Sequence, residues 1–204
     1  MMKNKVKIAV LVSGGGTNLQ ALIDAQKNGI IKNGKIQVVI SNNENAYALE
    51  RAKNNQIEQR VVLKKECLNQ LDFEQKIKDI IKEQEVQLIV LAGFMSILSQ
   101  DFTRDFEKRI INVHPSLIPS FCGKGFYGLK VHEEALKKGV KVTGATVHFV
   151  NEIPDGGEII MQKAVYIKDG DTPESLQRRV MEQAEWKILP KSVEKVCRKI
   201  LTEK

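Results

Sequence analysis

Two polar residues of this chain stand at one predicted strand end and face the same way. The segment 111–116 reads Ile-Asn-Val-His-Pro-Ser and directly follows a short apolar run. Side chains alternate between the faces of a strand, so Asn112 and His114 share one face, and Pro115 ends the strand because it cannot donate a ladder hydrogen bond. An amide can donate to a developing oxyanion, and an imidazole exchanges a proton near neutral pH. The pair predicts a catalytic site.

A third candidate, Asp155, lies far along the chain in a Pro-Asp-Gly-Gly run. A carboxylate close to His114 would stabilise the imidazolium, raise its pKa and fix its orientation, but only the fold can bring the two together. Each residue has a plainer interpretation, since a strand-end histidine is often structural and Asp-Gly-Gly is first of all a turn. His148, on an otherwise apolar segment, could equally be a satisfied core histidine. His132, beside two glutamates, is expected to face solvent.

A glycine-rich segment, residues 13–18, reads Ser-Gly-Gly-Gly-Thr-Asn and separates the first apolar run from a helical pattern. Bare backbone N–H groups at a helix start suit an anion, and Thr17 and Asn18 can cap the helix or donate to phosphate oxygens. Leu19 stands where a dinucleotide fingerprint needs its third glycine, and no Lys-Ser/Thr pair follows, which excludes a Walker-type loop. A tight turn is the alternative, but the position favours a phosphate monoester site.

Strands and helices alternate along the first half of the chain. Apolar β-branched runs and helical periodicity predict strands at 5–12, 36–40, 59–63, 86–92 and from 110, with helices from 17, at 46–54, near 71–81 and at 102–108. The alternation predicts an α/β fold, with a mostly parallel, Rossmann-like sheet covered by helices on both faces. Ligands of such sheets bind outside the carboxyl ends of the strands, where His114 and the glycine-rich segment both fall.

The pattern changes after Pro115. The expected elements are a loop at 120–128, a helix at 129–138, and an antiparallel pair of long strands at 141–150 and 158–167. Thr172 and Pro173 form a strong start for a C-terminal helix, which we expect to bend or break at Pro190. The absence of a linker or repeat predicts a single domain over residues 1–204.

The composition is that of an ordinary globular protein, with 42% apolar and 28% charged residues among 204. The net charge of +7 suits an anionic ligand, but the lysines are dispersed and aromatics reach only 5%, so no nucleic-acid partner is expected. No apolar run approaches the ~20 residues of a membrane span, so no membrane partner is expected. Three widely spaced cysteines without a CxxC motif fit reduced thiols in the cytoplasm and argue against a disulfide frame or a zinc knuckle.

Several motifs in combination carry a family resemblance. They occupy residues 13–20 (SGGGTNLQ), 91–95 (LAGFM), 112–119 (NVHPSLIP), 144–150 (GATVHFV) and 155–157 (DGG). With them the chain resembles, over essentially its whole length, the folate-dependent phosphoribosylglycinamide formyltransferases. The resemblance implies formyl transfer from 10-formyltetrahydrofolate to the amine of N1-(5-phospho-D-ribosyl)glycinamide in de novo purine (IMP) synthesis, in one formyltransferase domain with formyl-folate as co-substrate and no metal.

The resemblance also implies roles residue by residue. Asn112, His114 and Asp155 match the family's catalytic residues. The ribonucleotide site is implied at Gly15, Gly16, Thr17, Asn18 and Glu185, the last at the ribose hydroxyls. The folate site is implied at Met95, Ser96, Ile97, Leu98, Asn112, Val150, Asn151, Glu152, Ile153, Pro154 and Asp155.

The chain departs from the family pattern around the expected folate tail. Ser96 and Gln70 stand where arginines are expected, with Lys64 and Lys65 nearby. Cys122 lies close to the motif of His114 in sequence, but formyl transfer needs no thiol nucleophile, so we interpret it as a spectator.

Related formyl-folate enzymes are the nearest alternatives. A methionyl-tRNA formyltransferase carries an additional C-terminal nucleic-acid-binding domain, and a formyltetrahydrofolate deformylase carries an N-terminal regulatory domain. A nucleotide-binding module without catalysis would explain the glycine-rich segment but not Asn112, His114 and Asp155. The oligomeric state is left open, a homodimer included.

Overall fold

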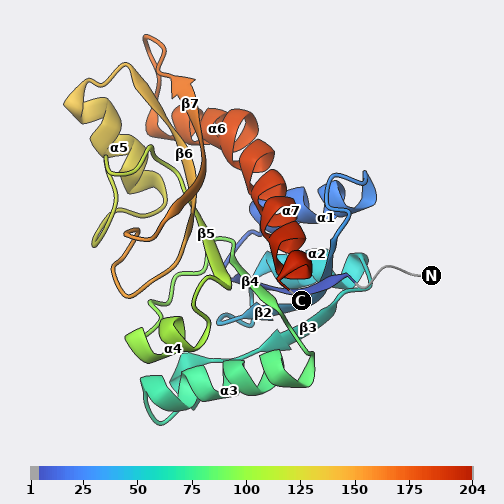
Figure 1. Cartoon of the computed structure of the whole chain (residues 1–204). Helices are drawn as coiled ribbons and strands as arrows, with labels where there is room; N and C mark the ends of the chain where they lie inside the picture. Colours follow the sequence, from blue (N-terminus) through green and yellow to red (C-terminus); the bar gives the residue numbers. More distant parts are fainter. Residues whose placement is uncertain (1–4, 204) are drawn as a thin grey trace.

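A seven-stranded sheet in the order β3-β2-β1-β4-β5-β6-β7 organises the chain (Figure 1). The computed structural model describes residues 5–203. The strands are β1 (Val6–Val12), β2 (Gly34–Ser41), β3 (Glu58–Val61), β4 (Leu88–Leu91), β5 (Ile110–His114), β6 (Val142–Phe149) and β7 (Ile159–Tyr166). The strands β1 to β5 pair in parallel, and β6 runs antiparallel to both β5 and β7. The predicted mostly parallel sheet and the antiparallel β6–β7 pair are confirmed.

Helices cover both faces of this sheet. They are α1 (Thr17–Lys27), α2 (Tyr47–Asn54), α3 (Gln70–Glu83), α4 (Gln100–Asp105), α5 (Leu129–Lys138), α6 (Pro173–Val180) and α7 (Trp186–Thr202). The strand β1 shows why two layers form: Ile8 and Val10 pack into the core beneath α1, α2 and α7, whereas Ala9 and Leu11 pack into the core beneath α3 and α4. Figure 1 shows α3 and α4 on the opposite side of the sheet from α7.

The prediction of a bend or break at Pro190 is wrong in its position. The helix α7 continues through Pro190, and the irregular turn lies before it, as a π-helical turn over Met181–Glu185. A proline ring crowds the carbonyl four residues earlier, which here belongs to Trp186, and the wider turn just ahead of Trp186 absorbs that crowding. The same turn presents Glu185 toward α1.

Candidate active site

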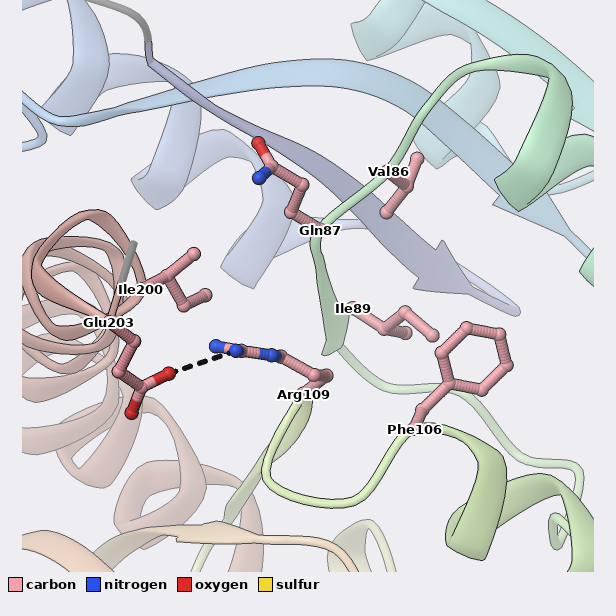
Figure 2. Close-up of a pocket in the computed structure, with 7 residues that line it drawn as sticks. All are labelled: Val86, Gln87, Ile89, Phe106, Arg109, Ile200 and Glu203. Atoms are coloured by element: carbon pink, nitrogen blue, oxygen red, sulfur yellow. Dashed lines mark hydrogen bonds and ion pairs between the residues drawn. The ribbon is translucent and has the colours of Figure 1, made fainter.

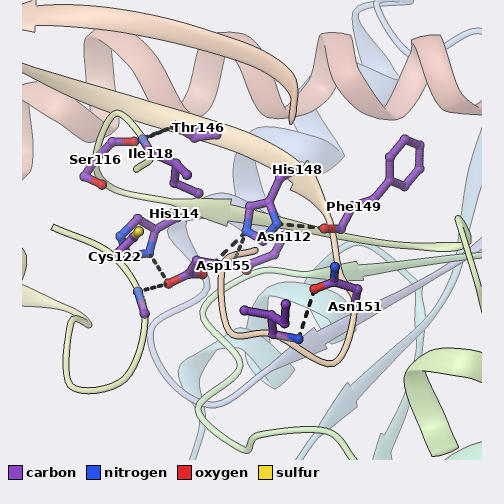
Figure 3. Close-up of polar contacts among 12 residues, drawn as sticks. Asn112, His114, Ser116, Ile118, Cys122, Thr146, His148, Phe149, Asn151 and Asp155 are labelled. Atoms are coloured by element: carbon purple, nitrogen blue, oxygen red, sulfur yellow. Dashed lines mark hydrogen bonds and ion pairs between the residues drawn. The ribbon is translucent and has the colours of Figure 1, made fainter. Parts of the chain in front are cut away.

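Asp155 lies between two histidine rings (Figure 3). Its Oδ2 is 3.5 Å from His114 Nδ1, and its Oδ1 is 3.5 Å from His148 Nε2. The backbone N–H of Gly123 donates to Oδ2 at 2.8 Å. The fold therefore brings Asp155 to His114, and it adds a second imidazole that the sequence patterns do not assign to the site.

The Asp-Gly-Gly run is a turn, as its composition predicts, and also the device that delivers Asp155. Asp155 itself has a left-handed backbone with φ +56°. A Cβ on Gly157 would lie 1.8 Å from the carbonyl oxygen of Phe149, so only glycine lets the loop close against the end of β6. The turn and the catalytic candidate are thus one feature.

His114 is almost fully enclosed, with 4% of its surface exposed. Its Nε2 is 2.8 Å from the Phe121 carbonyl oxygen, so both ring nitrogens face oxygen acceptors. Burial lowers the pKa of His114, and this outweighs Asp155 and the Phe121 carbonyl, which raise it. The expected net increase is therefore wrong, because the enclosure that brings Asp155 close also removes water from the ring. A lower pKa makes protonated His114 a stronger acid.

Asp155 remains a carboxylate in this setting. Burial raises its pKa, but His148, His114 and the Gly123 N–H lower it further, and the net pKa lies below the usual value. The ionised side chain fixes the orientation of His114, which the sequence predicts for a neighbouring carboxylate.

Asn112 and His148 are cross-strand partners in the antiparallel β5–β6 ladder. Asn112 Nδ2 lies 3.3 Å from His148 Nε2, and His148 Nδ1 lies 2.8 Å from the Phe149 carbonyl oxygen. The side chains of Asn112 and His114 point to the same side of β5, as alternation predicts (Figure 3). His148 is a buried, satisfied histidine, but its partners belong to the site. The pairing of β5 with β6, which sequence patterns did not provide, is the signal that would have identified it.

The glycine-rich segment forms a shallow turn ahead of α1. Gly16 has φ +71°, and a Cβ on it would lie 2.7 Å from Ala48 Cβ, so glycine is required there. The expected cap from Thr17 or Asn18 is wrong, because α1 has no side-chain cap. Arg51 Nε instead donates to the Gly15 carbonyl oxygen at 2.8 Å and turns that oxygen away from the helix start.

Glu185 lies beside the glycine-rich segment. Asn18 Nδ2 donates to Glu185 Oε2 at 2.6 Å. Burial raises the pKa of Glu185 to about 7, against the opposing effect of the Asn18 hydrogen bond. The structure thus brings together the two parts of the predicted ribonucleotide site from opposite ends of the chain.

An open pocket of about 480 Å³ lies beside the segment between β4 and α4. It is lined by Lys64, Gln70, Met95, Ser96, Ile97, Leu98 and Ser99. Met95 N donates to Ser13 Oγ, and Asn42 Nδ2 donates to Ser96 Oγ, both at 2.8 Å, which ties this wall to the glycine-rich segment.

The second predicted folate segment, residues 151–155, does not line that pocket. Of its side chains, Asp155 reaches the histidines, while Asn151 Oδ1 accepts from Ile153 N within the loop at 3.1 Å. Val150 is half-buried and packs into the same core as Leu98. The structure therefore divides the predicted folate residues between the pocket wall and the loop over Asp155.

A second hollow, of about 270 Å³, opens at the amino ends of β4 and β5, at the opposite edge of the sheet (Figure 2). Arg109 and Glu203 pair across it at 2.9 Å, above apolar side chains such as Ile89 and Ile200. Exposed pairs of this kind contribute little. The hollow holds none of the predicted site residues.

Two further side chains lie near His114. Burial, and then Asp155, raise the pKa of Cys122, which keeps it a thiol and agrees with its interpretation as a spectator. The expectation that His132 faces solvent is wrong, since it is fully buried on α5. Helical spacing places His132 on the face of Ala135 rather than with its glutamate neighbours.

Within residues 5–203, no cluster of histidine, cysteine, aspartate or glutamate side chains could hold a metal ion. In the same range, no helix has the length and apolar character needed to cross a membrane.

Known proteins share this sequence and architecture. The formyl transferase family model matches residues 6–193. A phosphoribosylglycinamide formyltransferase of Haemophilus influenzae is 47% identical over 184 residues, covering 90% of this chain and 84% of that protein. The human trifunctional purine biosynthetic protein adenosine-3 is 43% identical over 96% of this chain, which spans 19% of that longer protein.

Solved structures agree with the sequence relatives. The glycinamide ribonucleotide transformylase 1 of Symbiobacterium toebii has a TM-score of 0.89 at 37% identity, covering 97% of this chain and 90% of that one. A phosphoribosylglycinamide formyltransferase of Anaplasma phagocytophilum has a TM-score of 0.85 at 39% identity, with 96% and 89% covered. The chain therefore belongs to the phosphoribosylglycinamide formyltransferases of the formyl transferase family.

Proposed function

We propose that this chain transfers the formyl group of 10-formyltetrahydrofolate to the amine of N1-(5-phospho-D-ribosyl)glycinamide, in de novo purine synthesis. The observation that carries the proposal is Asp155 beside His114 and next to Asn112, with the Asn18–Glu185 pair also outside the carboxyl ends of the parallel strands. Group transfer and ribonucleotide binding are thereby assigned to one edge of the sheet. The printed names of the relatives support the same substrates.

The chemistry needs an oxyanion donor and a proton carrier. The neutral amine attacks the formyl carbon, and the carbonyl oxygen becomes an oxyanion. Asn112 and protonated His114 donate to that oxygen, and removal of one such donor typically costs ~100- to 1,000-fold in rate. The bond from the formyl carbon to the folate nitrogen then breaks, the amine loses a proton, and His114 or an attendant water delivers one to the leaving nitrogen.

The ribonucleotide is assigned to the glycine-rich segment and to Glu185. The backbone N–H groups of residues 15–17 and the start of α1 would receive the phosphate. The carboxyl of Glu185 would hydrogen-bond the ribose hydroxyls, and Asn18 joins the two subsites through its 2.6 Å bond to Glu185.

The folate is assigned to the walls formed by residues 95–98 and 150–155. In the pocket beside the first wall, Lys64 and Gln70 are the polar groups available for the glutamate tail, in place of the family's arginines. Formyl transfer by this route moves no electrons, so neither a metal nor a redox cofactor enters the proposal. Three cysteines kept as thiols suit a cytoplasmic enzyme.

Turnover of a formyl-folate analogue, followed by absorbance with and without the ribonucleotide, tests this function. We expect turnover that requires the ribonucleotide and yields one formylated product per folate released. His114→Asn should lose most of it, and full activity in that variant would refute the role of His114. Turnover without the ribonucleotide would identify a deformylase instead, and phosphate-ester binding without turnover would identify a nucleotide-binding module.

A further inference from the structure

We infer that His148 is a positioning residue that fixes the orientation of the Asn112 side-chain amide. The inference rests on the proposed function, because it matters only if Asn112 must present an N–H to the formyl oxygen. The two residues face each other across the β5–β6 ladder, with His148 Nε2 at 3.3 Å from Asn112 Nδ2.

The proton on His148 can be located from its partners. Nδ1 lies 2.8 Å from the carbonyl oxygen of Phe149, and a carbonyl oxygen can only accept, so Nδ1 carries a proton. In the neutral ring Nε2 is then bare and needs a donor. The Asn112 nitrogen supplies it, since an amide oxygen at the same place would face a lone pair.

The orientation of Asn112 follows from this tautomer. One N–H of Nδ2 goes to His148, and the other remains for an oxyanion. The reversed amide would present its oxygen to the developing negative charge and would repel it. The bare Nε2 of His148 therefore selects the one amide orientation that is useful in the reaction.

Asp155 competes for the same nitrogen. Its Oδ1 lies 3.5 Å from His148 Nε2, farther than the Asn112 amide nitrogen at 3.3 Å. If His148 were an imidazolium, Nε2–H would donate to Asp155 and the Asn112 amide would reverse. We assign the neutral ring, because Asp155 already receives the Gly123 N–H and faces His114 on its other oxygen.

The surroundings of His148 hold the ring in place. The ring is 1% exposed. The β6–β7 register shifts between Val147 and His148, and such bulges re-aim side chains beside active sites. The Phe149 carbonyl that binds Nδ1 rests against Gly157, where a Cβ would lie 1.8 Å away. The Asp-Gly-Gly loop therefore positions the acceptor that sets the tautomer as well as Asp155.

Two substitutions separate positioning from packing. His148→Gln keeps an acceptor near the place of Nε2, whereas His148→Asn keeps a donor near the place of Nδ1 and withdraws the contact with Asn112. We expect His148→Asn to lower kcat by about 100-fold, a typical cost of misplacing a catalytic group by ~1 Å, with the KM for the ribonucleotide little changed. His148→Gln should retain most of the kcat. Equal losses in both variants, or none in either, would overturn the inference.

A spectroscopic measurement on the wild-type full-length chain does not depend on the folding of either variant. The chain has three histidines, so two-bond 1H–15N correlation spectra of histidine-labelled protein can be assigned with one variant each. We expect a protonated Nδ1 and a bare Nε2 on His148 at neutral pH. A bare Nδ1, or an imidazolium, would refute the assignment. The spectra need no substrate, so they test the arrangement even if the wild type forms no formylated ribonucleotide, which would refute the proposed function alone.

Discussion

Asn18 Nδ2 donates to Glu185 Oε2 at 2.6 Å and so joins the first helix of the chain to the turn before its last. The π-helical turn over Met181–Glu185 aims the carboxyl inward, and Glu185 is only 6% exposed. One amide hydrogen bond cannot replace the water that an ionised carboxylate loses. The pair therefore holds a carboxyl group that is easily protonated.

Glu185→Gln should stabilise the protein at high pH. Burial raises the folded-state pKa of Glu185 to about 7 from a model value of 4.5. Between those values the folded state binds the proton and the unfolded state does not, so stability is full below about 4.5 and falls as pH rises through 7. The shift corresponds to roughly 3 kcal/mol. Urea unfolding at pH 5 and pH 8 should show a smaller decrease for the variant than for the wild type.

Ribonucleotide binding should move in the other direction in the same variant. An amide donates as well as accepts, and it lacks charge toward ribose hydroxyls, so the KM for the ribonucleotide should rise while folate binding stays unchanged. A wild-type stability that does not fall between pH 5 and pH 8 relative to the variant would contradict the buried-acid assignment.

Asp155→Asn should shift the pH dependence of formyl transfer. Asp155 raises the pKa of His114 against the dominant effect of burial, so its removal lowers that pKa further. The limb of the kcat/KM profile that reports protonated His114 should move to lower pH. At neutral pH the rate should fall by about 100-fold or more, from loss of both orientation and protonation.

His114→Asn is the matched control for this profile. It should lose the same limb altogether rather than shift it. An unshifted profile in Asp155→Asn, with a lower plateau only, would mean that Asp155 orients the ring without affecting its proton.

Periodicity and turn chemistry were enough to predict the sheet and the strand end that carries Asn112 and His114. Apolar runs dominate buried parallel strands, and glycine and proline punctuate them, so these elements follow from local sequence. The capping box at Thr172 with Ser175 is likewise local and was found at the predicted helix start. The α5 boundaries match for the same reason.

Contacts that depend on the packing of distant segments could not be predicted. His148 joins the site only because β6 pairs with β5, and nothing in its own segment indicates which strand it will face. The burial of His132 and the net pKa of His114 depend on what covers them. The proximity of Asp155 to His114 required a family resemblance to suggest it, since the loop that joins them is not a periodic element.

Gly157→Ala should displace Asp155 and destabilise the fold together. The added Cβ would lie 1.8 Å from the Phe149 carbonyl oxygen, and that backbone is held in the β6–β7 ladder and cannot withdraw cheaply. We expect a loss of about 1–3 kcal/mol in unfolding free energy, as for other overpacked positions, and a fall in kcat. Gly14→Ala is the stability control, because nothing lies within 4 Å of its Cβ. Equal stability of the two variants would contradict this account.

His132→Leu should stabilise the protein in acid. The ring is fully buried on α5 and neither nitrogen has a hydrogen-bond partner among the described residues. Burial, and then His114, lower its pKa to about 4 from 6.5. The unfolded state therefore binds the proton first, and wild-type stability falls as pH drops from 6.5 toward 4, by up to roughly 3 kcal/mol.

Leucine fills a similar volume without a group to protonate, so the variant should lose much of this acid sensitivity. It should also gain about 1 kcal/mol or more at pH 8, because unpaired buried polar atoms are costly. Urea unfolding at pH 5 and pH 8 measures both effects. Lys137→Met on the same helix is the matched control, since Lys137 is exposed and its pair with Glu134 contributes little. An acid sensitivity as steep in His132→Leu as in the wild type would assign the effect to His114 instead.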